Sequence, residues 1–113
     1  ESIERDAFAA YEAGNYQTSI DNFNKIADGN KEEYIDFYLG LAHLNLDKNE
    51  DAVKFFSRAI ENDSKFKAEA NWYLALTYLK MGDEPKARTR LQHQIDNFEF
   101  NKSNAAALLQ ELN

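Results

Sequence analysis

The chain has 113 residues, of which 43% are hydrophobic and 29% are charged, and this balance is typical of one folded domain rather than of a disordered segment. Its formal net charge of −7 disfavours binding to nucleic acid, because phosphate backbones are bound by clustered Lys and Arg side chains. The absence of cysteine excludes disulfides, thiolate metal sites and a cysteine nucleophile. No stretch approaches the roughly 18 apolar residues that a membrane-spanning helix needs, so we expect no direct insertion into a membrane.

Apolar residues recur at helical spacing through most of the chain and predict seven helices. In chain order, these are expected at about 2–13, 16–27, 32–46, 49–62, 66–81, 85–97 and 102–112. Gly14 and Gly82 are placed to end two helices in the left-handed conformation, which glycine adopts without steric cost. Asn15 and Asp83 follow these glycines and are predicted to cap the next helices through their side-chain oxygens. The middle pair of helices has Asp47 instead of glycine, which makes its turn the hardest to predict.

The helices repeat with a period of 33 to 35 residues. Small residues recur at two positions of this repeat, and larger apolar residues recur at a third. These sets are Ala7, Gly40 and Ala75; Ser19, Ala52 and Ala87; and Phe23, Phe56 and Leu91. A period in this range, with small and aromatic residues at fixed offsets, is typical of a helical repeat solenoid. We expect the small residues to let paired helices approach closely and the larger ones to fill the space between repeats.

Three stretches, one in each copy of the repeat, resemble the tetratricopeptide repeat family: YEAGNY at 11–16, YLGLA at 38–42 and WYLA at 72–75. The resemblance implies an all-α, right-handed solenoid of seven helices in a single domain over residues 1–113. The repeats would lie at about 1–31, 32–64 and 65–98, with a capping helix at about 101–112. The last helix fits a cap, because one stripe of it is apolar and would cover the open flank of the third repeat. The stripe contains Ala105, Leu108, Leu109 and Leu112.

The resemblance also implies a protein-binding surface, because in this family the first helices of the repeats line a concave groove that receives peptides. Most of the corresponding positions here are apolar or aromatic, and acidic residues accompany them. The predicted partner-binding residues are Phe8, Tyr11, Tyr34, Phe37, Leu41, Leu44, Trp72, Leu76 and Leu79, with Glu1, Glu4, Glu12 and Glu69 as an acidic rim. We therefore predict a non-catalytic module for protein–protein interaction. It would bind a hydrophobic or amphipathic segment of a protein or peptide, with basic flanks favoured by the rim.

The apolar groove is also compatible with a structural role. Its aromatic residues are the usual packing between neighbouring first helices, and a second copy of the chain would bury the groove in a homodimer. The runs at 71–83 and 107–112 are similar to repeat domains of bacterial envelope proteins, in which the domain follows a single membrane anchor. That likeness implies the periplasmic part of a longer, membrane-anchored parent protein, which would itself cover the groove; without it, the cytoplasm is the expected compartment.

The sequence predicts no catalytic, metal or cofactor site. His43 and His93 lie in different repeats, and a packed or surface role is expected for both. No glycine-rich phosphate loop is present, and no His, Asp and Glu residues have the spacing of metal ligands. Chaperone-binding members of the family grip a terminal carboxylate with Lys, Asn and Arg. The aligned positions here supply no positive charge, so we do not expect that role; they are Glu4, Phe8, Tyr38, Glu69 and Tyr73.

Overall fold

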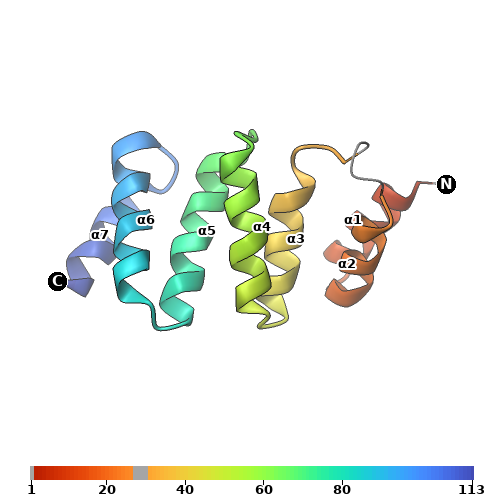
Figure 1. Ribbon diagram of the computed structural model, residues 1–113, viewed down its shortest axis with the longest axis horizontal. Helices are drawn as coiled ribbons and strands as arrows, with labels where there is room; N and C mark the ends of the chain where they lie inside the picture. Colours follow the sequence, from red (N-terminus) through yellow and green to blue (C-terminus); the bar gives the residue numbers. More distant parts are fainter. Residues whose placement is uncertain (1, 27–30) are drawn as a thin grey trace.

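The computed structural model describes residues 2–26 and 31–113, and within them the chain forms seven α-helices and no strand (Figure 1). The seven predicted helices are confirmed, and Ala27, expected in the second of them, lies outside the described residues. The helices are α1 (Ile3–Glu12), α2 (Tyr16–Asn24), α3 (Ile35–Asn45), α4 (Asn49–Glu61), α5 (Lys67–Lys80), α6 (Glu84–Asn97) and α7 (Lys102–Leu112).

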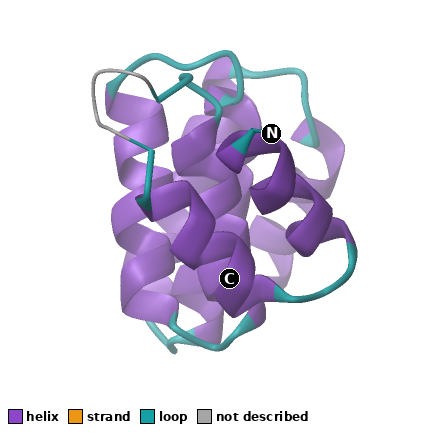
Figure 2. Ribbon diagram, turned by 90° about the vertical axis from the view of Figure 1, so that its right-hand side faces the viewer, coloured by secondary structure: helices purple, strands orange, loops and turns teal. Residues whose placement is uncertain are grey.

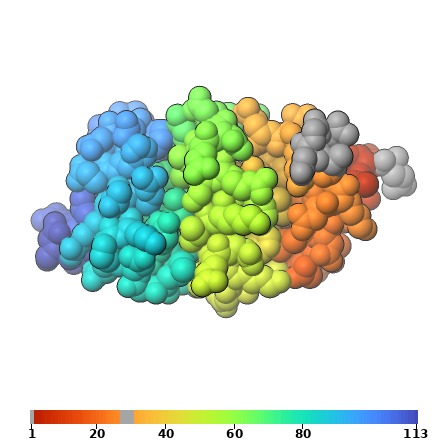
Figure 3. Space-filling model, viewed as in Figure 1, coloured from red at the N-terminus to blue at the C-terminus, as the bar shows by residue number. Residues whose placement is uncertain are grey.

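The helices pack in consecutive pairs, α1 with α2, α3 with α4 and α5 with α6, and α7 packs against α6. The pairs lie side by side along the longest axis of a body that measures 49 × 25 × 19 Å (Figure 1). We call α1, α3 and α5 the A layer, and α2, α4 and α6 the B layer, which is turned toward the viewer in Figures 1 and 3. Figure 2 shows the two layers from the N-terminal end, with loops at both ends of the helices. The predicted helical solenoid is therefore confirmed.

The turns inside the three pairs share one backbone structure although their sequences differ. Gly14 and Gly82 have φ angles of 81° and 80°, and Asp47 takes the same left-handed region with φ of 59°. In each turn the next amide donates to a carbonyl oxygen five residues earlier: Asn15 to Ala10 at 2.8 Å, Lys48 to His43 at 2.9 Å and Asp83 to Tyr78 at 2.8 Å. This is the hydrogen bonding of a Schellman motif, which Asp tolerates better than most non-glycine residues.

The predicted helix caps have different outcomes. The Asp83 side chain accepts a hydrogen bond from the Lys86 amide at 3.2 Å, as expected of an N-cap, and Pro85 lies in the first turn of α6. Asn15 occupies the same position before α2, but its exposed side chain makes no capping hydrogen bond. The prediction for Asn15 is therefore wrong, and solvent is left to satisfy the first amides of α2.

The small residues hold the two layers at close range. Ala7, Ala75, Ala52 and Ala87 are fully buried, and Gly40 is packed so closely that an added Cβ would lie 2.6 Å from two ring atoms of Phe56. The predicted packing role of these positions is confirmed. Ser19 adds a directional contact, because its hydroxyl donates to the Ala7 carbonyl oxygen at 2.8 Å and ties α2 to α1.

The last helix covers the end of the solenoid as predicted. Ala105 is fully buried in a cluster with Ala75 and Leu91. The remaining apolar residues of the stripe are half-buried and pack against this cluster; they are Leu108, Leu109 and Leu112. The Arg88 guanidinium donates to the Leu112 carbonyl oxygen and so satisfies part of the C-terminal end of α7.

Candidate functional site

Phe37 is a core residue, which corrects its assignment to the partner-binding groove. Its side chain is only 6% exposed. Its ring stacks on Phe66 with centroids 5.1 Å apart, and it lies 6.1 Å from each of the Phe56 and Tyr73 rings. The sequence places Phe37 at a position of α3 that faces the groove, but large neighbours from α4 and α5 close over it. A partner has little of this side chain to contact.

Most of the other predicted residues form the edge of the core on the A layer. They are half-buried and pack against one of the buried clusters: Phe8 and Tyr34 against the first, Leu41 and Leu44 against the second, and Trp72 against the third. Phe8 joins α1 to its neighbours, with ring centroids 5.1 Å from Phe23 and 5.6 Å from Tyr34. These side chains serve packing between repeats and keep part of their surface in solvent.

Leu76 and Leu79 differ from the residues above. Both are half-buried on α5, one helical turn apart, and neither belongs to the buried clusters or to the apolar residues packed on them in the described chain. Side chains three positions apart lie on one helix face. Tyr11 is likewise outside these clusters, but its ring contacts Tyr16 and Tyr38. Leu76 and Leu79 are therefore the two leucines of the predicted set that no described cluster includes.

Tyr38 and Tyr73 belong to this surface but are absent from the predicted set. The Tyr38 ring lies 4.9 Å from Phe8, 5.5 Å from Tyr11 and 5.4 Å from Phe37, so it joins α1 to α3. Burial is the main cause that raises the pKa of Tyr11 to about 12, and the neighbouring Tyr16, Tyr38 and Tyr73 hydroxyls contribute to the same rise. The sequence carries a signal for both residues, because Tyr73 lies one repeat of 35 residues after Tyr38.

The charged groups of the A layer are mostly acidic near α1. The Tyr34 hydroxyl donates to the Glu4 carboxylate, and this hydrogen bond is the main cause that raises the pKa of Tyr34 to about 12. Glu12 is exposed and Glu69 is half-buried, whereas Glu1 lies outside the described residues. On α5, the Lys80 ammonium is paired with the Asp47 carboxylate, so this cation is largely compensated.

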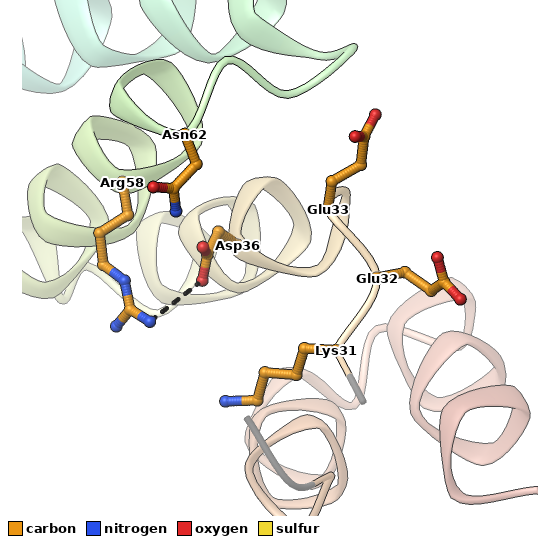
Figure 4. Close-up of a pocket in the computed structure, with 6 residues that line it drawn as sticks. All are labelled: Lys31, Glu32, Glu33, Asp36, Arg58 and Asn62. Atoms are coloured by element: carbon orange, nitrogen blue, oxygen red, sulfur yellow. Dashed lines mark ion pairs between the residues drawn. The ribbon is translucent and has the colours of Figure 1, made fainter. Parts of the chain in front are cut away.

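A charged pocket of about 270 Å³ lies between the start of α3 and the end of α4 (Figure 4). Its lining residues are Lys31, Glu32, Glu33, Asp36, Arg58 and Asn62. The Arg58 guanidinium lies 3.8 Å from the Asp36 carboxylate, while Figure 4 shows Glu32 and Glu33 directed away from Asp36. The carboxylates therefore do not converge, and residues 2–26 and 31–113 contain no group of three or more His, Cys, Asp and Glu side chains suited to a metal ion.

The two histidines have packing environments. His43 is buried, with its Nδ1 atom 2.8 Å from the Leu39 carbonyl oxygen and its ring stacked on Phe55 at 5.0 Å. His93 lies on α6 with its ring 5.6 Å from Phe98. Neither histidine is paired with a nucleophile or a carboxylate in the geometry of general acid–base catalysis. None of the described helices combines the length and apolar character needed to cross a membrane.

Two solved structures share this architecture. The crystal structure of PcrH in complex with the chaperone-binding region of PopB superposes with a TM-score of 0.81 over 95% of this chain and 91% of that chain, at 19% identity. The type III secretion translocator chaperone SycD of Yersinia enterocolitica gives a TM-score of 0.77 over 96% of this chain and 86% of that chain, at 18% identity. At these identities the likeness establishes the fold. No curated protein sequence matches the chain.

The family assignment comes from the sequence itself. A family model described as tetratricopeptide repeat matches residues 7–65 and again residues 37–92. The two matches overlap and together span most of the chain, from within α1 to within α6, so they reach into all three helix pairs of the solenoid. This protein belongs to the tetratricopeptide repeat family.

Proposed function

We propose that this domain is a non-catalytic module that binds an apolar or amphipathic segment of a partner protein on the A layer. The observation that carries the proposal is the pair of half-buried leucines on α5, Leu76 and Leu79, which lie outside the described core clusters. Half-buried Leu41 and Leu44 on α3 extend this apolar surface toward α1. The spacing of the leucines along each helix suits a partner that presents apolar residues on one face.

The charges support a partner with basic residues beside its apolar face. Glu4, Glu12 and Glu69 lie on the A-layer helices, and Lys80 is already paired with Asp47. Complementary charges at the rim of an interface steer association more than they strengthen it, so we expect salt to slow the association of this partner. The PcrH structure contains a bound segment of PopB, which shows that a fold of this shape holds a peptide segment in another protein.

A peptide selection tests the proposal without knowledge of the natural partner. A displayed random peptide library is panned on the domain, and the enriched peptides are measured by fluorescence anisotropy. We expect enriched peptides to carry apolar residues at helical spacing next to Lys or Arg. The double variant Leu76→Ala and Leu79→Ala should bind them at least about tenfold more weakly, because buried interface leucines each contribute on the order of 1 kcal/mol.

The matched control truncates two exposed apolar residues that lie outside the leucine pair, Met81 at the C-terminal end of α5 and Phe100 in the loop before α7, which are 41% and 40% exposed. We expect the double variant Met81→Ala and Phe100→Ala to bind the selected peptides as tightly as the unmodified domain. Equal weakening in both double variants, or peptides that bind the leucine variant at full strength, would contradict the proposal. Sedimentation of the unmodified domain checks for a homodimer, because a dimer closed on the A layer would dissociate in the leucine variant.

A further inference from the structure

A second pocket lies in the B layer, between α4 and α6 with α5 beneath them, on the side of the molecule shown in Figure 3. Its volume is about 280 Å³. It is lined by Ser57 of α4, by Leu74 and Tyr78 of α5, and by Lys86, Thr89 and Arg90 of α6. The lining thus combines two cations and three hydroxyls with no carboxylate. This composition contrasts with a chain that has 20 acidic and 13 basic residues.

Arg90 carries a positive charge that lacks a carboxylate partner. The residue is half-buried, and its guanidinium donates to the Asn71 side-chain oxygen at 3.1 Å, which is a neutral acceptor. Among the residues that the structure describes, no Asp or Glu lies within ion-pair distance of Arg90. Lys86 is only loosely compensated, with its ammonium 3.8 Å from the Asp83 carboxylate. Arg90 and Lys86 therefore line a concave site in which their positive charge is not fully compensated, and such a site attracts an anion.

The Arg90 guanidinium is held in place by a buried network. Asn71 is fully buried, and its amide donates to the Arg90 carbonyl oxygen at 3.0 Å and to the Gln94 side-chain oxygen at 2.7 Å. Gln94 in turn donates to the Phe100 carbonyl oxygen at 2.8 Å. A side chain fixed in this way loses little conformational entropy when a ligand binds, so the site is preorganised.

The hydroxyls complete the site in different ways. The Thr89 hydroxyl donates to the Pro85 carbonyl oxygen at 3.2 Å, so its hydrogen is not available to a ligand. Within the described chain, Ser57 and Tyr78 make no side-chain hydrogen bond, so their hydroxyls keep a hydrogen to donate. The floor of the pocket is apolar, because Leu74 is buried beneath it. The site offers hydrogen-bond donors and positive charge above an apolar base.

We propose that this B-layer pocket binds an oxyanion, either a carboxylate or a tetrahedral group such as sulfate or phosphate. Arg90 and Lys86 hold its charge, and Ser57 and Tyr78 donate to its oxygens. Charge-assisted hydrogen bonds from guanidinium to oxyanions are among the strongest in proteins, which gives Arg90 the leading role. The site takes Leu74 and Tyr78 from α5 but none of the leucines of the peptide-binding surface proposed above, so the two sites share no residue.

Amide chemical shifts of the isotope-labelled domain provide the test. The protein is titrated with sodium sulfate and, separately, with sodium acetate, and the ionic strength is held constant with sodium chloride. We expect saturable shifts at the amides of Ser57, Thr89 and Arg90 with a dissociation constant on the order of 1–10 mM, as befits a small ion. Saturation by sulfate alone assigns a tetrahedral ligand, and saturation by acetate alone assigns a carboxylate. Saturation by neither anion overturns the proposal.

Variants connect the binding to the named side chains. Arg90→Gln should weaken it about tenfold or more, because it removes the fixed cation. Lys86→Gln should weaken it by a smaller factor while leaving the Asn71 network intact, which keeps the test valid if Arg90→Gln disturbs folding. Lys25→Gln, an equal change of charge at the exposed end of α2, is the control and should leave the affinity unchanged. A loss in the control equal to that in Lys86→Gln would show general charge attraction and overturn the proposal.

Discussion

The two ends of this solenoid are held together by different interactions. Between the first two helix pairs, the rings of Phe8, Tyr34 and Tyr38 meet with centroids 4.9 to 6.4 Å apart. At the other end, the fully buried Asn71 and Gln94 connect α5, α6 and the loop before α7 through hydrogen bonds of their amide side chains. Aromatic contacts tolerate a range of orientations, whereas buried amides need partners at defined positions. The period of the repeat therefore sets where the helices lie, and individual side chains decide how each junction is held.

The largest effect is expected at the aromatic junction. Tyr38→Ala should lower the free energy of unfolding by about 3 kcal/mol, because it removes a ring that contacts both α1 and α3 residues and leaves a cavity. Tyr38→Phe keeps the ring and should change the stability by less than about 1 kcal/mol. Urea unfolding followed by circular dichroism measures both variants. If the two variants lose the same stability, the hydroxyl rather than the ring joins these repeats.

A smaller effect is expected at the polar junction. Asn71→Leu should lower the free energy of unfolding by about 2 kcal/mol, because Gln94 and Arg90 lose a buried partner. Gln94→Leu should destabilise the Asn71→Leu variant by less than it destabilises the unmodified protein, because it removes the Gln94 amide that Asn71→Leu leaves without a partner. The four proteins of this double-mutant cycle are compared by urea unfolding. Strictly additive losses would show that the two amides act separately rather than as one network.

The smallest effect concerns pH at the same end of the molecule. Burial lowers the pKa of His93 from its usual 6.5; Arg90 and, more weakly, Lys67 lower it further, and Asp96 opposes them. The unfolded chain therefore binds more protons than the folded one below pH 6.5, so the stability falls as the pH is lowered through that value. We expect His93→Gln to reduce the difference between urea midpoints at about pH 7.5 and pH 5.5. An unchanged difference would mean that carboxylates alone cause the acid sensitivity.

The contrast between the junctions also accounts for what could be predicted from the sequence. Helices, turns and the small packing positions follow from local spacing, and Asp47 shows that the period predicts a turn even where glycine is missing. The Asn71 network is different. Asn71 and Gln94 lie 23 residues apart, and nothing local indicates that their amides meet. Buried polar residues of this kind are recognised only when the packing of two helices is known.

The repeat register predicts the candidate partner surface in outline, and the structure corrects it in detail. The register identifies residues that face the A layer, but it cannot say how far neighbours cover them. Phe37 is buried by Phe66 and Tyr73. Leu76, which lies at the next groove-facing position of the repeat, is not part of the described core clusters. The difference arises from the sizes of side chains on the following helices, which a period does not encode.

Trp72 gives the C-terminal end its own spectroscopic signal. It is the one tryptophan of the chain, and it packs against the cluster of Ala75, Leu91 and Ala105 that α7 completes. Its fluorescence therefore reports the local environment of that end, whereas circular dichroism sums over all helices. Fraying of α7 in an otherwise intact solenoid would shift the emission colour before the helical signal declines. Trp72 fluorescence thus makes it practical to follow the opening of the C-terminal end alone, which circular dichroism cannot distinguish from the unfolding of other helices.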